Sequence, residues 1–146
     1  MNPFTPFTSD HEIAAIASGL LDRTLPKPHW THAAHFASTL WLLSERPELD
    51  LPRELPTIIR AYNEATGVAN TDHSGYHHTI TLASIRAARS FLAASPHSSL
   101  FLTCNALLAF PLGASDWLLS YWSRERLFSP EARRAWLDPD LQNLPF

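Results

Sequence analysis

Histidines in two short segments are the residues of this sequence best suited to chemistry. The first segment, W-T-H-A-A-H, carries His32 and His35, and the second, G-Y-H-H-T, carries His77 and His78. Residues three positions apart share one face of a helix, so His32 and His35 can direct both imidazoles into the same volume. If the second segment begins another helix of the same bundle, His77, or its neighbour His78, can bring a third imidazole to that volume.

Three imidazoles with one open coordination position are typical of catalytic zinc sites, in which the bound water becomes acidic. Iron, copper and nickel accept the same ligands. We therefore predict that His32, His35 and His77 hold a divalent metal ion, which is zinc, iron, copper or nickel. The predicted function is that of a metal-dependent enzyme acting on a small-molecule substrate.

Three further side chains are predicted to be catalytic, by orienting the substrate: Tyr76, His78 and Arg124. A phenol can donate a hydrogen bond, and a guanidinium can bind a carboxylate through two parallel hydrogen bonds. Tyr76 also fits a core position and Arg124 an exposed helix end. The sequence does not distinguish a hydrolase, a lyase or an oxygenase.

Two other functions fit the same residues. In the first, no metal is present, and two imidazoles act as an acid and a base in an enzyme. In the second, the protein is a non-catalytic helical module that binds a ligand or a partner, and its histidines are hydrogen-bonded core residues.

Apolar residues recur at helical spacing along the whole chain, and prolines separate the periodic segments. Ser9 and Thr31 are expected to cap the first two helices, with Trp30 packing on His35 as a hydrophobic staple. Ser129 is expected to cap the last helix, which Pro130 begins. The pattern predicts an all-α bundle of about six to seven helices in a single domain, residues 1–146. The helices are expected near residues 9–25, 31–46, 56–65, 75–94, 98–110 and 115–122 and after residue 129.

Composition limits the partners and the compartment. Hydrophobic residues make up 45% of the 146 residues, enough to fill one core, and the net charge is −3 without a basic cluster. We therefore expect no nucleic-acid and no membrane partner. The single Cys104 excludes an internal disulfide, residues 1–6 lack the pattern of an export signal, and no apolar run could span a bilayer. A cytoplasmic location is expected.

Four segments of the chain together resemble a group of small bacterial all-α proteins. These segments are W-T-H-x-x-H (30–35), Y-N-E (62–64), G-Y-H-x-T (75–79) and Y-x-S-R-E-R-L-F-S (121–129). The group carries W-T-H-x-x-H, G-Y-H-E-T and Y-S-x-E-R-L-F-S segments, and the likeness extends from about residue 25 to residue 145. It implies a shared fold and a site at His32, His35 and His77, and it names no reaction. His78 stands where the group has Glu, so a carboxylate role there is not carried over.

A looser likeness of architecture is to DinB-type helical bundles, which hold a metal ion with three histidines from separate helices. This likeness concerns the bundle alone, because a fold does not transfer a function.

Overall fold

The computed structural model describes residues 5–146, which form α-helices and short 3-10 helices without any strand. The predicted all-α class is therefore confirmed. No helix within residues 5–146 has both the length and the apolar character needed to cross a bilayer. Part of the expected absence of an export signal concerns residues 1–4, which lie outside the described residues.

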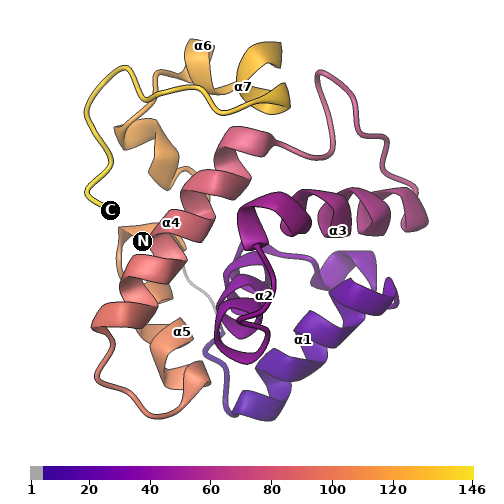
Figure 1. Cartoon of the computed structure of the whole chain (residues 1–146), viewed down its shortest axis with the longest axis vertical. Coiled ribbons are helices and arrows are strands. Elements are labelled where there is room, and N and C mark those ends of the chain that lie inside the picture. Colours follow the sequence, from indigo (N-terminus) through magenta and orange to yellow (C-terminus); the bar gives the residue numbers. More distant parts are fainter. Residues whose placement is uncertain (1–4) are drawn as a thin grey trace.

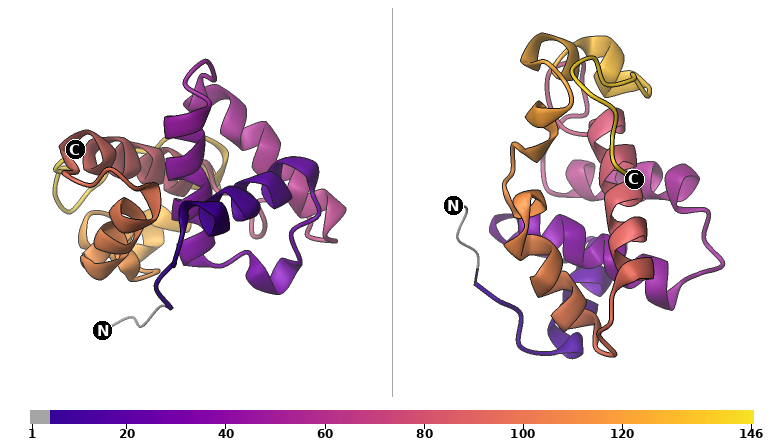
Figure 2. Two further views of the ribbon diagram at one scale, coloured as in Figure 1. Left: turned by 90° about the horizontal axis from the view of Figure 1, so that it is seen from below. Right: turned by 90° about the vertical axis from the view of Figure 1, so that its left-hand side faces the viewer.

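Helix α4 crosses the molecule and contacts α2, α3, α5 and α7, whereas α1 packs on α2, α3 and α5 (Figure 1). Helices α6 and α7 lie at its N-terminal end, and the C-terminal segment returns along it (Figure 2). The α-helices are α1 (Asp10–Asp22), α2 (His32–Glu45), α3 (Leu51–Ala65), α4 (His78–Ala94), α5 (Leu100–Ala109), α6 (Arg124–Leu127) and α7 (Pro130–Arg134). The 3-10 helices are η1 (Lys27–His29), η2 (Pro111–Gly113) and η3 (Trp117–Ser120).

The start of α2 follows the expected capping pattern and fixes the first histidine segment. The hydroxyl of Thr31 accepts a hydrogen bond from the backbone N–H of Ala34 at 3.1 Å. The rings of Trp30 and His35 pack with their centroids 5.5 Å apart, as a hydrophobic staple requires. His32 and His35 therefore occupy the first turn of a well-capped helix.

Helix α3 begins five residues earlier than expected. Pro52 lies in its first turn, where a missing N–H costs nothing, but Pro56 lies inside the helix. The helix continues through Pro56 because a row of its side chains is buried: Leu51, Leu55 and Ile59. Burial of each such side chain contributes about 1.5–3 kcal/mol, comparable with the roughly 3 kcal/mol cost of an internal proline.

The expected sixth helix at residues 115–122 is instead the short η3, and α6 begins only at Arg124. No side chain caps η3 at Asp116, whereas the hydroxyl of Ser123 caps α6. The last cap was predicted correctly, because Ser129 accepts the N–H of Ala132 at 3.2 Å and Pro130 opens α7.

Two clusters of buried side chains meet at α2. One lies among α2, α4, α5 and the C-terminal elements and includes Phe36, Leu40, Leu107 and Trp122. The other lies among α1, α2 and α3 and includes Leu20, Leu42, Leu55 and Tyr62. Because α2 contributes to both clusters, its orientation is fixed from two sides.

Candidate functional site

His32 and His35 line the same cavity, which has a volume of about 230 Å³. The start of α2 forms one wall, α4 a second and η3 a third. The cavity reaches the surface at Thr31, which is exposed. The lining residues are Trp30, Thr31, His32, His35, Ile80, Ser84, Trp117 and Leu118. We call this space the imidazole cavity.

His35 is held in its neutral form. Its surroundings lower the pKa from 6.5 to about 4, chiefly through loss of hydration and secondly through the charge of His32. The side chain is only partly exposed, where it borders the cavity. Within residues 5–146 neither ring nitrogen has a hydrogen-bond partner, so both are open to a bound molecule.

His32 is held in one tautomer by the backbone of η2. Its Nε2 lies 2.7 Å from the carbonyl oxygen of Leu112. Because a carbonyl only accepts, Nε2 carries the proton, and in the neutral ring the lone pair lies on Nδ1. The adjacent Gly113 permits this arrangement, since a Cβ at that position would lie 1.9 Å from the carbonyl oxygen of Leu108.

Ser84 and Trp117 also line the imidazole cavity. The indole N–H of Trp117 is buried and has no hydrogen-bond partner within the described part of the chain. A buried donor without a partner costs about 1–3 kcal/mol. No Asp, Glu, Lys or Arg of the described residues lines the cavity. The cavity therefore suits an uncharged molecule that carries hydrogen-bonding oxygen.

His77 is not part of this cavity, because both of its ring nitrogens are used for structure. Nδ1 accepts the N–H of Ile80 at 3.2 Å, which makes His77 the N-cap of α4. Nε2 donates to the carbonyl oxygen of Leu127 at 2.7 Å, and the side chain is 7% exposed. Burial lowers the pKa of His77, against the opposing effect of the Leu127 hydrogen bond.

The structure thus brings His32 and His35 together and leaves His77 apart. Among residues 5–146, no three His, Cys, Asp or Glu side chains lie close enough to hold a metal ion. His77 could offer a lone pair to a metal only by releasing Ile80 or Leu127. The arrangement present does not fit a three-imidazole metal site.

Tyr76 and His78 contact each other rather than the imidazole cavity. The phenol oxygen lies 2.8 Å from Nδ1 of His78, and the guanidinium of Arg60 lies 4.5 Å from the centre of the Tyr76 ring. Burial raises the pKa of Tyr76 to about 12. Burial and then the charge of Arg60 lower the pKa of His78. Neither side chain lines the imidazole cavity.

The glycine of the second histidine segment explains its shape. Gly75 has a φ of 76°, and a Cβ there would lie 2.5 Å from the carbonyl oxygen of Ala69. Asn70 accepts the N–H of Tyr76 at 3.0 Å, and Arg133 donates to the carbonyl oxygen of Gly75 at 3.0 Å. The chain therefore bends sharply at Gly75, and Tyr76 and the extended His77 lead from this bend into the start of α4.

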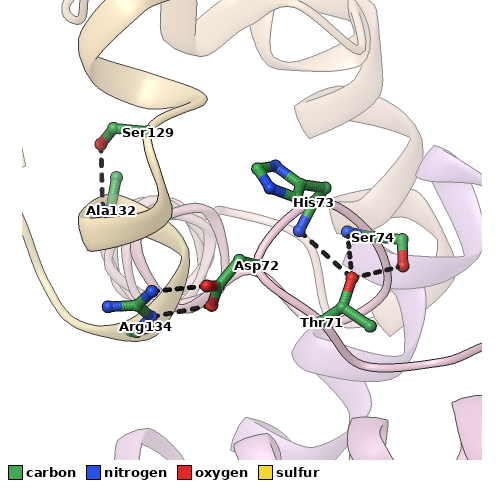
Figure 3. A network of polar contacts seen from close by, with 7 residues as sticks. All are labelled: Thr71, Asp72, His73, Ser74, Ser129, Ala132 and Arg134. Carbon is green, nitrogen blue, oxygen red and sulfur yellow. Dashed lines mark hydrogen bonds and ion pairs between the residues drawn. The ribbon is translucent and has the colours of Figure 1, made fainter.

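A network of exposed polar contacts joins the same loop to α7 (Figure 3). The guanidinium of Arg134 donates from Nε to the carboxylate of Asp72 at 2.8 Å and forms a second, parallel bond to it. The hydroxyl of Thr71 accepts the N–H groups of His73 and Ser74. The second histidine segment is thus held to α7 by both buried and exposed contacts.

Arg124, the remaining side chain predicted to be catalytic, is exposed on α6. Its guanidinium lies 5.5 Å from the centre of the Phe128 ring, and it does not line the imidazole cavity. Sequence reasoning missed Ser84 and Trp117 as cavity residues. Ser84 lies four residues after Ile80, on the helical face that lines the cavity, whereas Trp117 resembles any core tryptophan.

No family model, no curated protein and no solved structure matches this chain. The likeness to the group of small bacterial proteins therefore stays a prediction based on its segments, and the site must be interpreted from its own geometry.

Proposed function

We propose that the protein is an enzyme that moves a proton on an uncharged carbonyl compound bound in the imidazole cavity. The observation that carries this proposal is the pairing of two imidazoles in one cavity without charged lining residues. The Leu112 carbonyl fixes the tautomer of His32, and a low pKa keeps His35 neutral. This function corresponds to the metal-independent alternative considered from the sequence.

His32 acts as the general base in this proposal. The Leu112 carbonyl holds the Nε2–H, so the Nδ1 lone pair accepts a proton from the carbon next to the substrate carbonyl. The C–H bond breaks, its electron pair forms the enolate, and the proton stays on His32 until it is returned to carbon. The Leu112 oxygen also stabilises the imidazolium, which is the role an orienting acceptor has beside a catalytic histidine.

His35 and Ser84 stabilise the charge that develops on the carbonyl oxygen. A neutral imidazole N–H and a hydroxyl are both donors, and both residues line the cavity. Donors fixed in a poorly hydrated cavity act strongly on a developing oxyanion. Because the pKa of His35 is about 4, its ring remains a neutral donor throughout the neutral pH range.

Hydrogen–deuterium exchange on a simple ketone tests the proposal. Cyclohexanone is incubated with the protein in D₂O, and loss of its α-hydrogen signals is followed by proton NMR. The exchange rate is expected to fall about 100-fold in His32→Gln, in line with the loss of a general base. The exposed His97 provides the control, and His97→Gln should exchange at the wild-type rate. Equal rates in all three proteins would contradict the proposal.

Removing metal ions with a chelator distinguishes the predicted metal-dependent enzyme from this function. Two imidazoles at one cavity are the observation in its favour, although His77 would have to leave two hydrogen bonds to complete the ligand set. Exchange that survives EDTA supports proton transfer by the imidazoles alone. Exchange that is lost with EDTA and restored by zinc, iron, copper or nickel would support the metal site instead.

A non-catalytic binding module would behave differently from both enzymes. Cyclohexanone would then shift the ring signals of His32 and His35 without any deuterium exchange. That combination would retain the cavity as a ligand site and remove the catalytic role.

A further inference from the structure

A second and larger recess, of about 670 Å³, lies on the opposite side of the start of α2. Its walls are mostly apolar and come from the N-terminal segment, α1, α2 and α5, through residues that include Phe7, Ile16, Leu25, Ala33 and Leu108. The volume lies within the range of small-molecule sites, whereas that of the imidazole cavity lies below it. We call this recess the apolar groove.

Thr31, the N-cap of α2, lines both spaces. Successive helix residues are turned by about 100°, so His32 and His35 share one side of the first turn of α2. Ala33 and Ala34 lie on the other side and line the apolar groove. A molecule that lies over Thr31 would border both spaces.

The charges along the apolar groove indicate which molecules it can accept. Glu12 lines the groove, and its carboxylate accepts hydrogen bonds from the backbone and the hydroxyl of Thr8. Among residues 5–146 no Lys or Arg lines the groove, and His29 is its second titratable side chain. A carboxylate at an apolar surface with no Lys or Arg beside it disfavours fatty-acid anions and other acidic lipids.

We infer that the substrate is an uncharged ketone or aldehyde with an extended apolar chain, which lies in the apolar groove while its carbonyl reaches the imidazole cavity. This inference rests on the proposed function. It adds a second subsite and a substrate class, because the imidazole cavity alone holds only a small head group.

A series of ketones of increasing length tests the inference. 2-Butanone, 2-hexanone and 2-octanone are titrated into protein with labelled histidines, and NMR follows the ring signals of His32 and His35. Each added methylene that enters the groove should tighten binding about fourfold. Ala15→Trp should abolish this gain, because Ala15 is an exposed residue of α1 that lines the groove. Ser18→Trp, exposed on the same helix outside the groove, is the matched control and should keep it.

The outcomes separate the groove from the catalytic site. If 2-butanone shifts the histidine signals but longer chains bind no tighter, the inference is wrong and the proposed function stands. A gain with chain length that persists in Ala15→Trp, or is lost equally in Ser18→Trp, also overturns it. Chain binding without any response of the histidines would show a separate apolar site and would contradict both the inference and the proposed function. Self-association that Ala15→Trp abolishes, without any gain from longer chains, would make the groove an interface and overturn the inference.

Discussion

The two histidine segments begin two helices of one bundle, but they differ in whether their imidazole nitrogens are hydrogen-bonded. In the first, His35 has no hydrogen-bond partner within residues 5–146, and His32 keeps one nitrogen open. In the second, both nitrogens of His77 are bonded, and His78 contacts Tyr76. The difference teaches that a histidine at a helix start becomes available for chemistry only when the neighbouring backbone leaves its lone pairs free.

The largest expected loss of stability follows from a substitution in the second histidine segment. His77→Ala removes the cap of α4 and leaves the buried carbonyl of Leu127 without its donor. We expect the free energy of unfolding in urea to fall by about 2–4 kcal/mol. His97→Ala, at an exposed histidine, should leave it unchanged. A His77→Ala protein as stable as the wild type would mean that the hydrogen bonds of His77 are not structural.

The next effect on stability concerns His35 in the first histidine segment and depends on pH. The pKa of His35 is about 4 in the folded protein and 6.5 when unfolded, so on acidification the unfolded chain takes up this proton first. The stability contribution of His35 is therefore complete above about pH 6.5, is lost as the pH falls towards 4, and is constant below that. The shift corresponds to about 3 kcal/mol.

Comparison with His35→Leu isolates this contribution, because burial also lowers the pKa of His77 and of His78. Urea unfolding of both proteins at several pH values should show that the wild type loses more stability between neutral pH and pH 4. Parallel curves would mean that His35 is well hydrated in the folded state.

A smaller effect is expected at the contact between the Tyr76 phenol and His78. Tyr76→Phe removes one hydrogen bond of 2.8 Å, and we expect a loss of about 1 kcal/mol in the free energy of unfolding. The ketone-dependent shifts of the His32 and His35 signals should not change, since Tyr76 does not line their cavity. Reduced ketone affinity in this variant would connect the two regions.

The smallest effect is expected at the exposed ion pair between Asp72 and Arg134. Hydrogen bonding to Arg134 lowers the pKa of Asp72, but both side chains remain in contact with solvent. In concentrated salt, Asp72→Asn should unfold at the same urea concentration as the wild type, because salt screens exposed charges. A clear loss of stability in salt would show that this surface contact holds the second segment as strongly as the buried ones do.

Local features of the fold were predictable from the sequence, whereas distant partners were not. The cap at Thr31 and the packing of Trp30 on His35 follow from spacing within six residues, and both are present. The fate of His77 depends on the carbonyl of Leu127, 50 residues later in the chain, which no local pattern reveals. The early start of α3 was missed because the buried row of leucines offsets the interruption expected at Pro56.

The candidate site was likewise predictable only where it depends on local spacing. The pairing of His32 and His35 follows from their spacing of three, and both line one cavity. Trp117 reaches that cavity from η3, where a helix was expected, so its contribution could not be placed. The metal prediction required a third imidazole from a helix start, and spacing cannot show whether such a side chain caps its own helix or faces a neighbour.

Gly113 fixes the position of the Leu112 carbonyl, which holds the proton of His32 on Nε2 from a distant part of the chain. Any larger residue there would push η2 away from the end of α5, since even a methyl group would meet the Leu108 carbonyl at 1.9 Å. The Leu112 oxygen would move with it, and the proton of His32, 80 residues earlier, would lose the acceptor that keeps it on Nε2. Gly113 also lines the apolar groove, so a single substitution there would change both the groove and the nitrogen of His32 that carries the proton.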